Sequence, residues 1–317
     1  MSITKKQNLI GQLLLLLATI AWGSSFAILK QTIRDVPACF VIGLRFVSAS
    51  TILFIIFFKK IIRVKKDALL RGLLLGLVLS LAYYVQTMGL KYTTPGRNAF
   101  LTALYCVITP FLLWIMYKKK PKFYNLLSAG LCLLGIGLLS LSSSEETGEL
   151  VMLGNVLTVV SAVFYSLQII CIDHCHSKGD DNMVMLFFEI VVVGVVLMIL
   201  SLTTELPKLG IDAFKLNGEQ ILKIEYLTLV CTLFAQMAQI LGMKYTTPIQ
   251  TSLILSLEAV FGALFSVILG EESFSLTLGL GFAIVFLSMM ITEFKLDPLK
   301  LLRKNQQSSD CNLDEDK

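Results

Sequence analysis

The most informative shortage in this sequence is of charge. Only 15% of its 317 residues are Asp, Glu, Lys or Arg and only two are His, whereas 56% are apolar and the mean hydropathy is +0.78. Soluble domains usually carry about 25% charged and about 45 to 50% apolar residues. So few charges cannot cover this much apolar surface in water, which excludes a soluble enzyme, a disordered chain, a coiled coil and a secreted disulfide scaffold. The composition indicates a protein that crosses a membrane many times.

The sequence also lacks the common catalytic and cofactor-binding motifs. It contains no Walker loop, G-x-S-x-G elbow, H-E-x-x-H pair or dinucleotide-binding glycine pattern, so we expect neither an enzyme nor a cofactor, and no ATP-driven pumping. The seven cysteines are scattered and predict no disulfide framework. Cys171, His174 and Cys175 would share a helix face, but no second CxxC or HxxxH stands nearby, so we expect no metal site.

Ten apolar runs follow one another along the chain, each near the roughly 20 residues that a helix needs to cross a bilayer. They are rich in Leu, Ile, Val and Phe without alternation of period two, which favours helices over barrel strands. The predicted fold is an all-α membrane protein with ten transmembrane helices. The runs lie near residues 8–29, 38–58, 69–90, 98–117, 124–142, 151–171, 184–203, 225–243, 249–269 and 275–294.

The distribution of Lys and Arg between the loops predicts the orientation. With the N-terminus inside, the cytoplasmic segments hold 19 of these residues and the external loops hold seven, in agreement with the positive-inside rule. We therefore expect a protein of the cytoplasmic membrane with residues 1–7 and a polar tail, residues 295–317, both in the cytoplasm. The net charge of +5 is explained by this topology, so no nucleic-acid partner is expected.

A short polar motif occurs twice. GLKYTTP at residues 89–95 returns as GMKYTTP at residues 242–248, an offset of 153 residues. This indicates a duplication with five helices in each half, residues 8–142 and 151–294, joined by an external linker at 143–150. Because five is odd, the second half enters the membrane inverted, as in many secondary transporters. Such halves can exchange roles in alternating access, although duplication could also have served only to build a stable bundle.

Polar residues recur at helical spacing on the predicted spans. Asn98, Thr102 and Tyr105 share one helix face, and Tyr165 and Gln168 share another. Since polar groups avoid lipid, these faces predict a water-filled cavity between the halves, with hydrogen bonding between helices as the alternative. The predicted cavity residues are Trp22, Arg45, Tyr83, Gln86, Asn98, Thr102, Tyr105, Tyr165, Gln168, Gln236, Gln239 and Glu258.

Three ionisable residues stand well inside apolar runs. Glu258 lies near the middle of its run, where hydrocarbon favours the neutral carboxylic acid, and is the candidate for proton coupling; a structural hydrogen bond is the alternative. Arg45 would hold a carboxylate of the solute or fix its helix through a salt bridge or carbonyl contacts. Glu189 lies nearer the cytoplasmic end of its run, where we expect it to reach the interface or cap a helix, with a part in function as the alternative.

Several motifs resemble those of one family. They are AWGSSF at residues 21–26, PGRNAFLT at 95–102, FYSLQ at 164–168, LEAVF at 257–261 and LGE at 269–271. As a set, the chain resembles the drug/metabolite transporter superfamily, in particular members with two EamA-type domains. The resemblance implies transport of small organic solutes, often outward, through a central cavity. Two departures matter: Ala259 replaces a common proline, which argues against a kink in the ninth helix, and LGE has no copy after the fourth helix, which suggests that the two gates differ.

We therefore expect a secondary transporter that exports a small organic metabolite, amino-acid-like or amphipathic, by alternating access, with protons as the expected coupling ion. Its partners would be the solute and the lipid bilayer, and the sequence leaves open whether it is a monomer or a homodimer. A non-transporting sensor or scaffold, and an enzyme acting on lipid-linked substrates, remain as alternatives at this stage.

Overall fold

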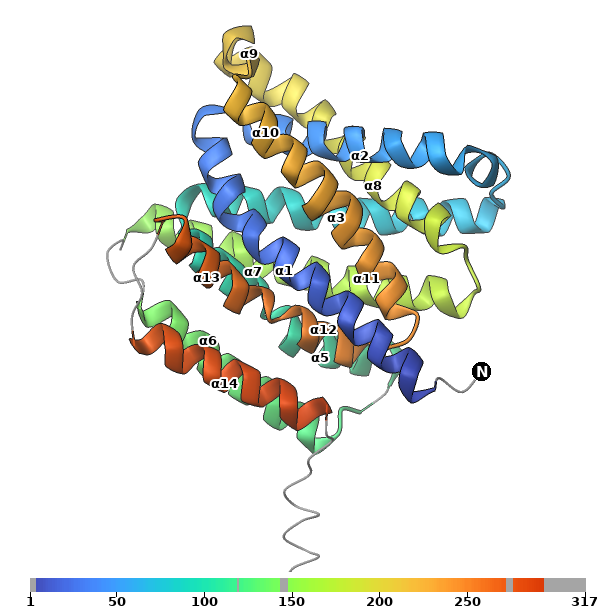
Figure 1. The fold of residues 1–317 in the computed structure, drawn as a ribbon, viewed down its shortest axis with the longest axis vertical. Coiled ribbons are helices and arrows are strands. Elements are labelled where there is room, and N and C mark those ends of the chain that lie inside the picture. The colour runs from blue at the N-terminus through green and yellow to red at the C-terminus, as the bar shows by residue number, and fades with distance from the viewer. Residues whose placement is uncertain (1–3, 119, 143–147, 272–275, 294–317) are drawn as a thin grey trace, which may run out of the picture.

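A computed structural model describes residues 4–118, 120–142, 148–271 and 276–293, and all regular structure within these ranges is helical. Eight of the helices are long and apolar enough to cross a membrane. Two further helices, α6 (Phe123–Ser142) and α14 (Leu276–Glu293), have 20 and 18 residues and lie side by side at one margin of the bundle (Figure 1). Together they agree with the ten predicted spans and confirm the all-α fold class.

Several spans consist of consecutive helical segments. The first half starts with α1 (Lys5–Asp35), α2 (Ala38–Ile61), which is kinked at Phe57, and α3 (Lys66–Tyr92), followed by α4 (Pro95–Thr102) with α5 (Tyr105–Tyr117). The second half starts with α7 (Glu149–Ser177). Its other spans are α8 (Asn182–Leu200) with the π-helical η1 (Ser201–Glu205) and α9 (Leu206–Leu209), α10 (Gly218–Tyr226) with the π-helical η3 (Leu227–Phe234) and α11 (Ala235–Met243), and α12 (Pro248–Leu255) with α13 (Glu258–Ile268). A short 3₁₀ helix, η2 (Ile211–Phe214), precedes α10.

Two hydrogen-bonded contacts of α1 show that the halves are inverted. Near the start of α1, Asn8 Nδ2 donates to the Tyr245 carbonyl at 3.0 Å, and near its end Lys30 Nζ donates to the carbonyls of Leu90 and Thr93 at 2.8 and 2.9 Å. Asn8 and Lys30 are about 33 Å apart along a helix. The two copies of the repeated motif therefore lie at opposite ends of the bundle. We call the end at Asn8 the N face and the end at Lys30 the far face.

Glycine allows two pairs of helices to touch backbone to backbone. A Cβ on Gly89 of α3 would lie 2.8 Å from the Gly154 carbonyl of α7, and a Cβ on Gly11 of α1 would lie 2.8 Å from the Gly242 carbonyl of α11. Gly242 follows Gly89 by 153 residues and Gly154 follows Gly11 by 143 residues, so the same contact between the two halves occurs twice. The α3–α7 contact is at the far face and the α1–α11 contact at the N face, as an inverted repeat requires.

The fourth and ninth spans are broken at equivalent positions. The α-helical pattern stops at Ala103 in one and at Ser256 in the other, where backbone N–H groups bond three residues back instead of four. The second segments then start at Tyr105 and Glu258, which are 153 residues apart. Ala259 argues against a kink in the ninth span, yet the helix is interrupted just before it, between Leu255 and Glu258. The break is made by a 3₁₀-like turn of the backbone, which needs no proline.

A residue of the second half caps a helix of the first. Pro37 precedes α2 and offers no side-chain cap for the free N–H groups at the helix start. Glu205, at the end of η1, accepts the backbone N–H groups of Cys39 and Phe40 at 3.0 and 3.1 Å. Its carboxylate also accepts the Ser201 hydroxyl at 2.9 Å. The negative charge suits the positive end of the α2 dipole, so Glu205 ties the two halves together at the far face.

Candidate functional site

A central cavity lies between the two halves, deep within the bundle. Its volume open to the centre of a water molecule is about 30 Å³, enough for one or two waters. A larger solute therefore requires the surrounding side chains to move apart. The lining residues are Trp22, Ser25, Phe26, Leu79, Tyr83, Gln86, Tyr105, Tyr165, Gln168, Ile169, Gln236, Gln239, Leu255 and Glu258.

The cavity wall itself follows the repeat. At an offset of 153 residues, the lining residues Tyr83 and Gln236 correspond, as do Gln86 and Gln239, and Tyr105 and Glu258. Between α1 and α7 the offset is 143 residues, because the second half has ten more residues between α7 and α11 than the first half has between α1 and α3. This shorter offset relates three further lining pairs: Trp22 with Tyr165, Ser25 with Gln168, and Phe26 with Ile169.

Nine of the twelve predicted cavity residues line the cavity, and Arg45, Asn98 and Thr102 do not. Asn98 lies behind the wall, where its Nδ2 donates to Thr158 Oγ1 at 2.7 Å. Thr102 accepts a hydrogen bond from Gln86 Nε2 at 2.9 Å. Thr102 therefore positions the lining side chain of Gln86, whereas Asn98 joins α4 to α7, and neither residue meets the cavity.

Arg45 is buried behind Tyr83. Its Nε donates to Thr232 Oγ1 at 2.7 Å, and its guanidinium carbon lies 5.5 Å from the centre of the Tyr83 ring, a cation–π distance. Thr232 belongs to η3 and itself donates to the Leu227 carbonyl at 2.9 Å. The arginine therefore holds α2 against the π-helical segment of the eighth span. Of the two interpretations of Arg45 from the sequence, this geometry fits the one in which it fixes its helix.

Aromatic side chains form one part of the wall. The Tyr165 hydroxyl donates to Gln86 Oε1 at 2.8 Å, and the Tyr165 ring makes edge-to-face contacts with Tyr83 and Tyr105 at centroid distances of 5.8 and 6.4 Å. Trp22 donates its indole N–H to the Cys231 carbonyl at 2.9 Å, a carbonyl of the π-helical segment. The Tyr165 and Trp22 rings are thus fixed at their polar tips and present their apolar bodies to the cavity.

Hydrogen-bond acceptors form another part of the wall. Glu258 Oε1 and Gln236 Oε1 are both buried and have no hydrogen-bond partner in the structure. Buried acceptors without partners are costly, so these atoms would bind water or a hydrogen-bond donor on a solute. Among the described side chains, no three His, Cys, Asp or Glu residues are placed to hold a metal ion.

Sequence reasoning missed five lining residues, of which four are apolar. The sequence prediction used the helical spacing of polar residues, and such a pattern cannot identify apolar residues that line a cavity. Ser25 could have been found, because it corresponds to Gln168 at the offset that relates Trp22 to Tyr165. The missed residues are Ser25, Phe26, Leu79, Ile169 and Leu255.

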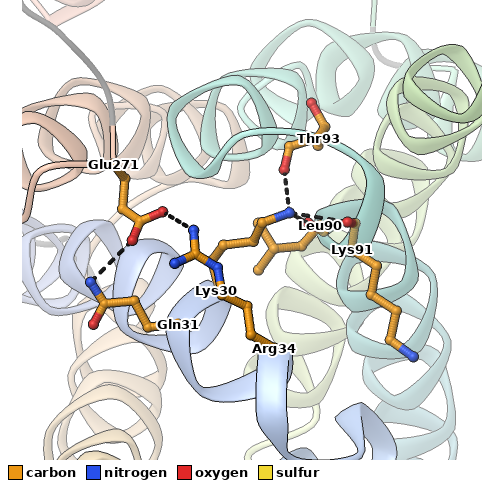
Figure 2. Close-up of polar contacts among 7 residues, drawn as sticks. All are labelled: Lys30, Gln31, Arg34, Leu90, Lys91, Thr93 and Glu271. Carbon is orange, nitrogen blue, oxygen red and sulfur yellow. Dashed lines mark hydrogen bonds and ion pairs between the residues drawn. The ribbon is translucent and has the colours of Figure 1, made fainter. Parts of the chain in front are cut away.

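Polar contacts join α1 to the end of α3 and to the residue after α13 at the far face (Figure 2). Lys30 of α1 donates to the last carbonyls of α3, those of Leu90, Lys91 and Thr93, at 2.8, 3.0 and 2.9 Å. One turn on, Arg34 pairs with Glu271, which follows α13, at 2.6 Å. We call the Lys30 contacts the Lys30 tie. The residue that corresponds to Lys30 at the N face is Asp173, whose carboxylate cannot donate to carbonyls, so the two faces differ in chemistry.

Comparison with known proteins identifies the family. The model of the EamA-like transporter family matches residues 9–141 and again 152–294. The chain belongs to this family. The match in two copies agrees with the duplication, and the resemblance seen in the sequence motifs is confirmed. The protein is accordingly a multi-pass membrane transporter.

Two individual relatives of this chain are also named as transporters. An "Uncharacterized transporter" of Archaeoglobus fulgidus is 27% identical over 292 residues, which cover 92% of this chain and 88% of the relative. The "Uncharacterized transporter YoaV" of Bacillus subtilis is 25% identical over 171 residues, 51% of this chain and 59% of the relative. A crystal structure at 15% identity matches with a TM-score of 0.70 over 89% of this chain and 96% of the other, which shows a shared fold.

Proposed function

We propose that this EamA-family protein is a secondary carrier that exports a small organic metabolite, amino-acid-like or amphipathic, through the central cavity by alternating access. The observation that carries the proposal is the meeting of two equivalent helix breaks at one cavity. The second segments of the broken spans begin at Tyr105 and Glu258, and both residues line the cavity. Discontinuous helices at the interface of inverted repeats are the usual place of solute sites in secondary transporters.

The contacts at the two faces support a two-state cycle. In the closed far face, α1 is held to α3 by the Lys30 tie and to the end of α13 by the Arg34–Glu271 pair. These bonds can break without disturbing the helix packing beneath, because side chains make them. An arrangement of this kind fits a gate that opens and closes, with the cavity below it exposed in one state and sealed in the other.

The orientation follows from the positive-inside rule. We place the N face and both termini in the cytoplasm and the far face outside, since the loops of the N face carry most of the Lys and Arg residues. Glu258 is the proton-coupling residue of the proposal. Its buried carboxyl lines the cavity with one oxygen free, so a solute and a proton would compete for it or bind together.

Cysteine accessibility tests the cavity. In a variant without the seven native cysteines, Gln86→Cys and Gln168→Cys should react with a water-soluble thiol reagent. Leu81→Cys and Val163→Cys are matched controls on the same two helices, because these side chains are 47% and 36% exposed on the apolar outer surface. They should stay unreactive in a bilayer. Equal inertness of all four would contradict a water-filled pathway through the cavity.

Counterflow tests transport itself. Thermal-shift screening of amino acids, nucleosides and amphipathic amines first finds compounds that stabilise the protein. Proteoliposomes loaded with such a compound should then take up its labelled form against the gradient. Stabilisation without counterflow would instead favour a sensor, and the proposal would fail.

A further inference from the structure

A second buried carboxyl lies directly behind the cavity wall. Glu189 is the eighth residue of α8 and its side chain is fully buried. Its Oε1 accepts a hydrogen bond from Gln168 Nε2 at 2.7 Å, while Oε2 is buried without a partner. None of the ion pairs among the described residues includes Glu189. The expectation that Glu189 reaches the interface or caps a helix is therefore wrong.

Among the described residues, no cation forms an ion pair with Glu189. From α3 the titratable group that faces it is Tyr83, and from α7 the facing groups are Cys171 and Cys175. The buried cation of α2, Arg45, is bonded to Thr232. A carboxylate with a single hydrogen bond and no counter-charge would be very costly in this interior. A proton on Oε2 removes the charge and leaves Oε1 free to accept from Gln168.

Two amide side chains connect Glu189 to the cavity. Gln168 Nε2 also donates to Gln239 Oε1 at 3.0 Å, and Gln239 Nε2 donates back to Gln168 Oε1 at 3.1 Å. Gln168 and Gln239 both line the cavity. Both amide hydrogens of Gln168 are thus in use, one toward Glu189 and one toward Gln239. A solute that bonds to either glutamine must compete with this arrangement and will alter the hydrogen bond that Glu189 receives.

We propose that Glu189 is a second proton-binding carboxyl of the transport site, connected to the cavity through the Gln168–Gln239 amide pair. The inference rests on the proposed function, since it assigns the carboxyl a part in solute movement. The O–H bond of the carboxylic acid breaks when water reaches Glu189 in another state of the cycle, and the proton leaves on that water. The carboxylate left behind keeps its hydrogen bond from Gln168. Glu258 meets the solute directly, whereas Glu189 responds to it through the amides.

Infrared spectroscopy of the full chain in liposomes tests the proton site without any solute. A protonated carboxylic acid has a carbonyl stretching band that disappears when the group ionises. Glu189→Gln should remove one such band from the wild-type spectrum, and Glu258→Gln should remove a different one. If Glu189→Gln leaves every protonated-carboxyl band in place from acid to alkaline pH, Glu189 binds no proton and the proposal fails.

Glutamine variants test the connection. Gln168→Leu should shift the frequency of the Glu189 band because its carbonyl loses a donor, and this variant also serves if Glu189→Gln does not fold. Gln239 forms no hydrogen bond with Glu189 in the described structure. Gln239→Leu should therefore shift the same band only because it breaks the hydrogen bonds between the two glutamines. Gln236→Leu is the matched control, because Gln236 lines the same cavity on α11 and forms no hydrogen bond with either glutamine in the described structure. Identical spectra for Gln239→Leu and Gln236→Leu would overturn the connection.

The result separates this inference from the proposed function. Loss of the band together with absent counterflow would mean that Glu189 binds a proton in a protein that does not transport the compounds screened. Counterflow with an unchanged spectrum would uphold the carrier and overturn the role of Glu189.

Discussion

Replacing Lys30 with methionine should open the far face. The ammonium group makes three hydrogen bonds to the end of α3, two of them partly buried and one exposed. A fully buried hydrogen bond of a charged group contributes about 1.5 to 3 kcal/mol, and exposure reduces this because water can replace the lysine. We therefore take the whole Lys30 tie as about 3 kcal/mol in favour of the closed face, which corresponds to a population change of about 150-fold.

The assay is the rate of thiol labelling in the cavity. In a cysteine-free background with Gln86→Cys, a membrane-impermeant reagent added outside intact cells reacts only when the far face is open. Lys30→Met should raise this labelling rate by up to about 150-fold, as long as the closed state dominates before the change. Arg34→Gln should raise it by less than about fivefold, because its ion pair is 56% exposed on the arginine side.

Lys208 provides the control for a general effect of lost charge. It is an exposed lysine at the same face, at the end of α9, so Lys208→Met should leave the labelling rate unchanged. If Lys30→Met also leaves the rate unchanged, or lowers it, the Lys30 tie does not close the cavity. Labelling only when the reagent is added to the outside of inverted vesicles, which is the original cytoplasmic side, would instead show that the assigned orientation is wrong.

Three further predictions concern single carboxylates. Glu258→Gln should weaken the dependence of a confirmed substrate's transport rate on external pH and leave the part that Glu189 contributes, and a pH profile like that of the wild type would exclude Glu258 as a proton carrier. Glu205→Gln removes one of two accepting oxygens at the start of α2 and should destabilise the protein by about 1 to 2 kcal/mol, seen as a lower apparent Tm, while the exposed Glu225→Gln should not. Partial burial raises the pKa of Asp181, but hydrogen bonds from Lys60 and from the backbone of Met183 and Val184 lower it more, so its pKa lies below the ordinary 3.8. The ionised Asp181 carboxylate therefore stabilises the folded protein fully above pH 3.8, and this contribution is lost as the pH falls through the lowered pKa. Asp181→Ala should lower the free energy of unfolding by about 1 kcal/mol at pH 7 and by distinctly less at pH 3. An equal loss of stability at the two pH values would refute the assignment.

The repeat could be found from the sequence because it involves polar residues. Lys, Tyr, two Thr and Pro at residues 91–95 and 244–248 are unusual in chains dominated by leucine, so their recurrence is informative. The equivalence of the first and sixth spans is harder to find from the sequence, because the corresponding residues differ in type: Trp22 corresponds to Tyr165, and Ser25 to Gln168. Their equivalence appears only when the structure places each pair across the same cavity.

The helix breaks could not be predicted from local composition. Ala103–Leu104 and Ser256–Leu257 contain neither proline nor glycine, and their backbone angles stay close to helical values. A shift of hydrogen bonding by one residue at these places depends on packing from other helices. The same limit applies to Asn98 and Thr102: periodicity placed them on the polar face of their span, but only the structure shows that Gln86 stands between Thr102 and the cavity.

The glycine contacts between α1 and α11 and between α3 and α7 indicate how the bundle can change its shape at a low cost in free energy. Where Gly11 meets Gly242 and Gly89 meets Gly154, neither glycine has a side chain that would hold the two backbones apart, so each helix pair can pivot about this close contact. One of these contacts lies at the N face and the other at the far face. When the two helices of a pair pivot, they therefore move apart most at the end opposite their contact. Residues that choose the solute can then vary during evolution while the mechanics of the bundle stay the same.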